Sequence, residues 1–196
     1  MHFYDHYCGT LNSALERLEI TDALGQLLES EAGMNALQAM TRKLQQADAS
    51  MFLVGNGASA AFASHMALDW TKNGRVRTHA FNDSALLTAL GNDLGYEDAF
   101  SAPLGWYAAS GDLLVTISSS GSSPNILKCI ATARDKGLQV VTFSGFKETN
   151  PSRRLGDLNF YVPARTYGIV ECAHQVLLHV WLDAFMGVEE WSLDVP

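Results

Sequence analysis

Residues 113–124 read LLVTISSSGSSP, and this stretch decides the fold class. The run 113–117 is typical of a strand that is buried on both faces of a sheet. Ser123 and Pro124 are residue types favoured just before a helix and at its first position. A buried strand that leads through a short polar turn into a helix is half of a βαβ unit.

The same order recurs on both sides of this stretch. The apolar runs predict further strands at 51–54, 78–81, 139–143 and 158–162. Helical periodicity predicts helices over 59–72, 84–90, 124–136 and 170–186, with another ending near residue 109. Alternating strands and helices predict an α/β fold with a parallel sheet, right-handed crossovers and helices on both faces. Ligands of such folds bind beyond the carboxyl ends of the strands.

The first fifty residues have a different pattern. Leu, Ile, Ala and Met recur at helical spacing over 12–18, 22–28 and 34–44, which predicts an N-terminal helical extension. No linker or repeat divides the chain. We therefore expect one domain, with N-terminal helices over 1–48, an α/β core over 49–186 and a tail over 187–196 that the sequence does not place.

Composition narrows the class of protein. The chain has 196 residues and a formal net charge of −8, with 47% hydrophobic and only 17% charged residues. This composition excludes disorder, and the acidic balance argues against nucleic acid or an anionic membrane as partner. The three cysteines show no CxxC spacing, so neither a disulfide framework nor a structural zinc site is expected. Because neither a signal peptide nor a membrane span is recognisable, we expect a cytoplasmic protein.

Two strand-to-helix turns have the chemistry of an anion site. Residues 118–123 carry five hydroxyls directly before a helix N-terminus, where the helix dipole and free N–H groups favour a phosphate. This turn contains no lysine or arginine, so it would hold the anion through neutral hydrogen bonds. The alternative is a solvated serine–glycine loop that only caps a helix.

The second turn, 55–60, reads GNGASA and matches the pattern G-x-G-x-x-A. One interpretation is a dinucleotide fingerprint with Asp83 as the ribose-binding acid. The other is a sugar site, in which Asn56 and Ser59 are polar contacts and glycine lets the backbone approach closely. One short domain with two phosphate-type turns has little room for a dinucleotide and its substrate, which favours the sugar site.

Two predicted helices carry side chains suited to catalysis. His65 and Asp69 lie four residues apart and therefore share one helix face. Glu171 and His179 lie in the apolar last helix, where a carboxylate and an imidazole are costly to bury unless they are paired or bind a metal. Catalysis by this chain would require these four side chains to lie close together in the folded protein.

Taken together, these motifs resemble a known family. GNGAS, the helix with His65, LTALGNDLGYEDAF, SSSGSSPN and the late helix with His179 are similar to the SIS (sugar isomerase) domain, most of all to the phosphoheptose isomerases. The resemblance spans residues 34–185. It implies a three-layer sandwich with a five-stranded parallel sheet in flavodoxin-like order. It also implies a homotetramer with active sites at subunit interfaces.

The resemblance also implies the roles of single residues. The serine-rich turn would hold the sugar phosphate, and the first turn, Asp93 and Glu171 would contact the sugar. The substrate-binding set is Asn56, Gly57, Ser59, Asp93, Ser118, Ser119, Ser120, Ser123 and Glu171. The family's zinc ligands correspond to His65, Asp69, Glu171 and His179, and its acid–base pair corresponds to Asp69 and His179.

This chain departs from the family at three positions. Asp69 stands where the family has glutamate, Glu171 where it has glutamine, and Cys172 where it usually has glutamate. The shorter Asp69 sets its carboxylate back by roughly 1 to 1.5 Å, a displacement that matters for catalytic geometry. Two histidines and two carboxylates would neutralise a zinc ion, so these changes preserve the chemistry of metal binding.

Three hypotheses for function follow. The first is an aldose–ketose isomerase that converts sedoheptulose 7-phosphate to D-glycero-D-manno-heptose 7-phosphate through an enediol. The second is a catalytically silent SIS domain that binds a phosphosugar or a partner protein, as replication-initiator-associating relatives do. The third is an isomerase for a different sugar phosphate, with its pocket reshaped by Glu171 and Cys172.

Overall fold

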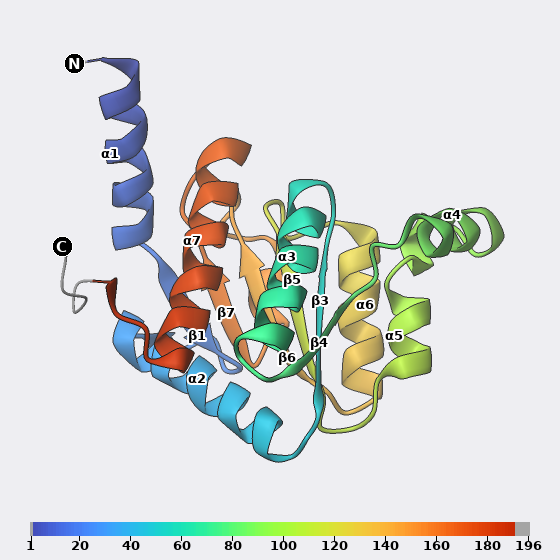
Figure 1. The fold of residues 1–196 in the computed structure, drawn as a ribbon. Helices are drawn as coiled ribbons and strands as arrows, with labels where there is room; N and C mark the ends of the chain where they lie inside the picture. Colours follow the sequence, from blue (N-terminus) through green and yellow to red (C-terminus); the bar gives the residue numbers. More distant parts are fainter. Residues whose placement is uncertain (1, 191–196) are drawn as a thin grey trace.

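The computed structural model describes residues 2–190 and shows one sheet between two layers of helices (Figure 1). The predicted tail therefore lies outside the described residues from position 191 onward. The five parallel strands run in the order β4-β3-β5-β6-β7, and numbering them along the chain gives 2-1-3-4-5. This is the predicted flavodoxin-like order. The strands are β3 (Ser50–Gly55), β4 (Arg77–Ala80), β5 (Leu113–Ser118), β6 (Gln139–Ser144) and β7 (Leu158–Tyr161).

The prediction of five strands was wrong for the sheet as a whole, which has seven. The two additional strands, β1 (Glu19–Asp22) and β2 (Leu27–Leu28), form an antiparallel hairpin. Strand β1 pairs antiparallel with β7 and so continues the sheet beyond its parallel part. The N-terminal extension is therefore not wholly helical, because residues 22–28, predicted as a helix, form most of this hairpin.

The hairpin forms because local polar contacts outweigh the helical periodicity. The Asp22 carboxylate accepts hydrogen bonds from the backbone N–H groups of Leu24 and Gln26, both at 2.9 Å. Gly25 has φ 76°, a conformation that suits glycine and ends a helix. Leu24 and Leu27 are 82% and 68% exposed, so the apolar residues that suggested a helix do not face the core.

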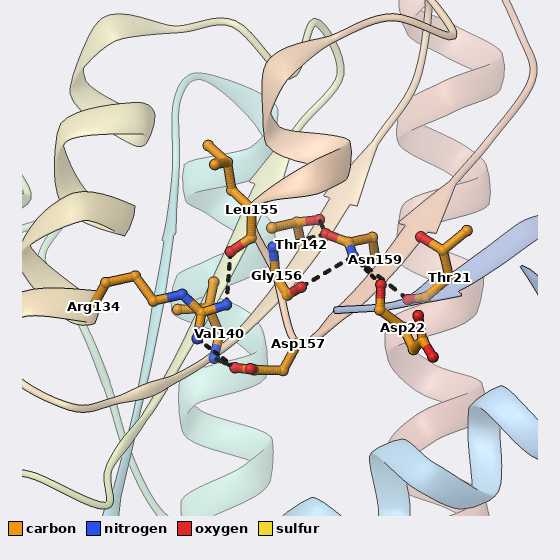
Figure 2. A network of polar contacts seen from close by, with 9 residues as sticks. All are labelled: Thr21, Asp22, Arg134, Val140, Thr142, Leu155, Gly156, Asp157 and Asn159. Carbon is orange, nitrogen blue, oxygen red and sulfur yellow. Dashed lines mark hydrogen bonds and ion pairs between the residues drawn. The ribbon is translucent and has the colours of Figure 1, made fainter. Parts of the chain in front are cut away.

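A buried polar network fastens the hairpin to the parallel strands (Figure 2). The Asn159 side chain on β7 accepts from the Thr142 hydroxyl at 2.9 Å and from the Gly156 N–H at 2.8 Å. Its amide nitrogen donates to the Gly156 carbonyl at 3.1 Å and to the Asp22 carbonyl at 3.4 Å. Because Asn159 is only 1% exposed, these bonds replace those it would make to water.

The helices cover the two faces of the sheet in separate groups. One face carries α1 (Phe3–Glu16), α2 (Ser30–Gln46), α3 (Ala58–Lys72) and α7 (Tyr167–Met186). The other face carries α4 (Ser84–Asp93), α5 (Ser101–Tyr107) and α6 (Pro124–Asp135). Short 3₁₀ turns, η1 (Tyr96–Asp98) and η2 (Pro151–Arg154), join these elements. Among residues 2–190, no helix is long and apolar enough to cross a membrane.

Aromatic packing holds α3 against α7. The Trp70 ring on α3 lies 4.6 Å from the Trp181 ring and 5.1 Å from the Phe185 ring, both on α7. Trp70 and Trp181 are fully buried, and aromatic side chains of this size dominate the energetics of a core. The two helices that carry the predicted catalytic residues are therefore side by side (Figure 1).

Candidate active site

The two polar turns meet at the carboxyl edge of the sheet. Strands β3 and β5 are neighbours, and Gly55 at the end of β3 pairs with Ile117 near the end of β5. Beyond them lies a cavity of about 110 Å³. It contains seven of the predicted substrate-binding residues, together with Ile117 and Tyr167. The seven are Asn56, Ser59, Ser118, Ser119, Ser120, Ser123 and Glu171.

The serine turn is shaped by a glycine and a buried asparagine. Gly121 has φ 60°, and a Cβ added there would lie 2.0 Å from the Asn150 Oδ1. The Gly121 carbonyl accepts a 3.0 Å hydrogen bond from the Ser152 N–H, and Asn150 is 2% exposed. The turn therefore rests on a packed polar support, which sequence reasoning missed because Asn150 lies about thirty residues further along the chain.

Hydroxyls in this turn have free capacity for a ligand. The Ser119 Oγ is buried and, within the described part of the chain, makes no hydrogen bond. The Ser123 side chain does not cap α6, although its backbone stands at the N-cap position. A buried hydroxyl without a partner is costly, and a bound phosphate would satisfy it. The N-terminus of α6 adds a favourable dipole for the same anion.

The first turn is also built around glycine. Gly57 begins α3 with φ 59° and ψ −124°, a backbone conformation that other residues adopt only with strain. It is exposed beside the cavity rather than among the residues that line it. The proposed role of Asp83 as a ribose-binding acid is not supported, because its carboxylate accepts from the Leu86 N–H and caps α4.

Asp93 lies apart from this cavity in the single chain. It is exposed at the end of α4, where its carboxylate accepts a 2.7 Å hydrogen bond from the Asn92 side chain. Neither the serine cavity nor the adjoining one beside Tyr96 includes it. Its predicted contact with the sugar stays a prediction.

Three of the four predicted metal ligands come together between α3 and α7. The ligand atoms of His65, Asp69 and His179 all lie within 4.8 Å of one another. The His65 Nε2 is 3.2 Å from an Asp69 carboxylate oxygen, and the rings of His65 and His179 are 5.3 Å apart. Two imidazoles and one carboxylate form a donor set typical of catalytic zinc sites, which keep one position open.

Glu171 does not belong to this cluster. It precedes His179 by eight residues on α7, a rise of about 12 Å along the helix. Its side chain lines the serine cavity instead. Of the four predicted ligands, three therefore form the cluster, and Glu171 lines the serine cavity.

Two side-chain contacts near Glu171 could not be predicted from the sequence. The hydroxyl of Tyr7 on α1 lies 3.9 Å from the Cys172 Sγ, and this contact raises the pKa of Tyr7 above its ordinary value. One turn further along, His174 is fully buried and its Nε2 is 3.1 Å from the Ser144 carbonyl. Burial lowers the pKa of His174 to about 4, against the opposing effect of that hydrogen bond.

Comparison with known proteins identifies the family. The family model described as "SIS domain" matches residues 6–145. The chain belongs to the SIS domain family. Within this family it is 34% identical, over 185 residues, to a phosphoheptose isomerase of Burkholderia pseudomallei (strain 1710b). That match covers 85% of this chain and 93% of the relative.

Solved SIS domain structures show the same architecture. The structure of phosphoheptose isomerase GmhA from Neisseria gonorrhoeae has a TM-score of 0.80 at 25% identity, over 93% of this chain and 94% of that one. The structure of a phosphoheptose isomerase from Francisella tularensis has a TM-score of 0.78 at 22% identity, over 94% and 98% of the two chains. The helix-flanked, mostly parallel sheet is therefore shared with these proteins.

Proposed function

We propose that this SIS domain is an aldose–ketose isomerase for a phosphosugar, with sedoheptulose 7-phosphate as substrate and D-glycero-D-manno-heptose 7-phosphate as product. The relatives named phosphoheptose isomerase support this substrate, because they match along most of the chain. One observation carries the proposal: α3 and α7 each contribute residues both to the serine cavity and to the cluster of His65, Asp69 and His179.

Each of these helices contributes to both parts. Helix α3 places Ser59 at the cavity, His65 about 9 Å further along its axis and Asp69 about 15 Å further along. Helix α7 places Glu171 at the cavity and His179 about 12 Å further along. A linear sugar held by its phosphate at the serine turn therefore has acid–base groups along its length.

The three clustered residues fit a zinc ion. His65, Asp69 and His179 would hold it, since their donor atoms are close together and of the types that zinc prefers. When bound, such an ion polarises a carbonyl group and stabilises negative charge on oxygen. Glu171 is assigned to the sugar chain in the cavity rather than to the ion.

The protein's own groups would carry the protons. The Asp69 carboxylate takes a proton from C1 of the ketose, which gives an enediol, and returns it to C2 to give the aldose. His179 serves the oxygens, where O1 loses a proton and O2 gains one. The serine turn holds the phosphate and so keeps the reacting carbons beside Asp69.

Exposed apolar residues beside the cluster support a homotetramer with active sites at its interfaces. Leu68 on α3 is 62% exposed, and Val176 and Val180 on α7 are 38% and 45% exposed. Apolar residues grouped next to catalytic groups are expected to be covered by another copy of the chain. Light scattering would then give a mass about four times the 21.3 kDa of the chain.

Metal analysis and an NMR assay test the function directly. Purified protein is expected to hold about one zinc per chain and to produce a new aldose signal from sedoheptulose 7-phosphate. Removal of the metal by a chelator should abolish turnover, and stoichiometric zinc should restore it. Protein with no metal and no aldose signal would favour the silent binding domain, whereas turnover of other ketose phosphates alone would change the substrate.

A further inference from the structure

A pair of asparagines joins the two turns of the site. The Asn56 Nδ2 donates to the Asn125 Oδ1 at 3.0 Å, and the Asn125 Nδ2 donates back to the Asn56 Oδ1 at 2.9 Å. Asn56 belongs to the turn after β3, whereas Asn125 lies in the first turn of α6, directly after the serine turn. Asn125 is 3% exposed, so its amide is held inside the protein.

A third hydrogen bond reaches Asn56 from another element. The Tyr96 hydroxyl on η1 donates to the Asn56 Oδ1 at 3.0 Å. The η1 turn is itself tied to α6, because the Lys128 ammonium lies 2.8 Å from the Asp98 carboxylate. Asn56 is thus held by residues from two elements that are anchored to each other.

These bonds hold the Asn56 amide with its oxygen toward the Asn125 amide nitrogen and the Tyr96 hydroxyl. Its oxygen accepts two hydrogen bonds, which uses both of its lone pairs. Its nitrogen gives one N–H to Asn125, and within residues 2–190 no partner is present for the second N–H. Asn56 also lines the serine cavity, and the hydrogen-bonding capacity left on its side chain is this N–H donor.

We infer that Asn125 and Tyr96 are positioning residues, which orient the Asn56 amide so that it donates to an oxygen of the sugar chain. This inference rests on the proposed isomerase function. A freely rotating amide would present its oxygen as often as its nitrogen, and the wrong orientation would oppose the lone pairs of a substrate carbonyl or hydroxyl oxygen. The pair therefore selects a substrate with an acceptor beside the phosphate-bearing end.

A double-mutant cycle tests whether Asn125 acts through Asn56. The variant Asn125→Leu keeps the side-chain volume and adds no charge beside the phosphate site, but it removes both hydrogen bonds to the Asn56 amide. We expect kcat/KM and the affinity for sedoheptulose 7-phosphate to fall about 10-fold or more, as for an unpaired buried polar group. In the Asn56→Ala background the same change should alter both quantities less than about 2-fold.

Two further measurements separate positioning from general damage. Tyr96→Phe removes one bond of the three and should lower kcat/KM about 3-fold in the wild type, with no loss in the Asn56→Ala background. The affinity for inorganic phosphate should stay within about 2-fold in every variant, since the serine turn is unchanged. Asn12→Leu on the outside of α1 is the matched control and should isomerise and bind phosphate as the wild type does.

The outcomes distinguish this inference from the proposed function. If losses from Asn125→Leu and Asn56→Ala multiply, Asn125 acts independently and the inference is overturned. If phosphate affinity falls with sugar affinity, Asn125 supports the serine turn as a whole, which also overturns it. If the wild type binds sedoheptulose 7-phosphate without converting it, only the proposed isomerase function is contradicted. The mutant cycle can then still be measured, because calorimetry gives the dissociation constant of each variant.

Discussion

The two ends of the candidate site are built in different ways. The serine turn consists largely of backbone and buried polar support, with Gly121 packed against Asn150 and a buried Ser119 hydroxyl facing the cavity. The cluster at the other end consists of side chains on α3 and α7. His65 is about half exposed there, and Asp69 is 20% exposed.

This difference bears on the positions at which the resemblance implies a departure from the family. A turn that depends on positive φ values and on close backbone packing tolerates few substitutions. Side chains that project from a rigid helix pair can be exchanged without disturbing the fold. The three departures that the resemblance implies, Asp69, Glu171 and Cys172, are all side chains on α3 or α7. Asp69 lies in the cluster, whereas Glu171 lines the serine cavity.

Asp69→Asn should have the largest effect, and only at the cluster end. Turnover is expected to fall by about 10²- to 10⁴-fold, because the general base is lost. Affinity for inorganic phosphate and the melting temperature should change little, since Asp69 lies away from the serine turn. NMR on samples quenched at successive times measures the turnover rate, and calorimetry measures phosphate binding.

Asp48→Asn is the matched control for this variant. Asp48 is 86% exposed and has φ 52°, a conformation that asparagine adopts readily. This control should isomerise at the wild-type rate. An Asp69→Asn enzyme that does the same would remove Asp69 from the mechanism and leave the cluster without a base.

Gly121→Ala should damage the other end instead. The added Cβ would collide with Asn150 in a left-handed backbone conformation, so we expect a loss of about 2–5 kcal/mol of stability and most of the phosphate affinity. Urea unfolding and phosphate titration measure the two effects. Gly105→Ala, on α5 with open space around it, should be neutral or stabilising by up to about 1 kcal/mol. If Gly121→Ala and Gly105→Ala had the same stability and phosphate affinity, Gly121 would not be packed closely against Asn150 as described.

His174 predicts a smaller effect, which depends on pH. Its folded pKa of about 4 lies below the ordinary value of 6.5, so the unfolded chain binds more protons between these pH values. Above pH 6.5, His174 is uncharged in both states and does not lower the free energy of unfolding. As the pH falls from 6.5 toward 4, this free energy decreases by up to about 3 kcal/mol. Urea unfolding at a series of pH values measures it. His174→Gln should flatten this slope, and an unchanged slope would assign the acid sensitivity to other groups.

The parts of the fold and site that sequence reasoning found share a local signal. Apolar runs indicate the buried strands, and the serines, Gly121 and Pro124 indicate the turn after β5. The i, i+4 spacing was enough to place His65 beside Asp69. The flavodoxin-like strand order required the family resemblance in addition.

What sequence reasoning missed depends on contacts between distant residues. The helix predicted over 22–28 fails because Asp22 bonds to backbone groups of a turn, a competition that apolar periodicity does not register. Asn125 and Tyr96 lie within the motifs SSSGSSPN and LTALGNDLGYEDAF, but only the folded chain brings their side chains to Asn56. The separation of Glu171 from the cluster follows from helix length rather than from residue type.

The hairpin of β1 and β2 has a consequence for the behaviour of the protein in solution. Without it, β7 would be the outermost strand of the sheet and would offer its free backbone groups to any passing chain. The hairpin replaces that four-residue edge with β2, which is only two residues long and gives a foreign strand little to pair with. At this end of the sheet, the hairpin therefore limits strand-to-strand association with other chains.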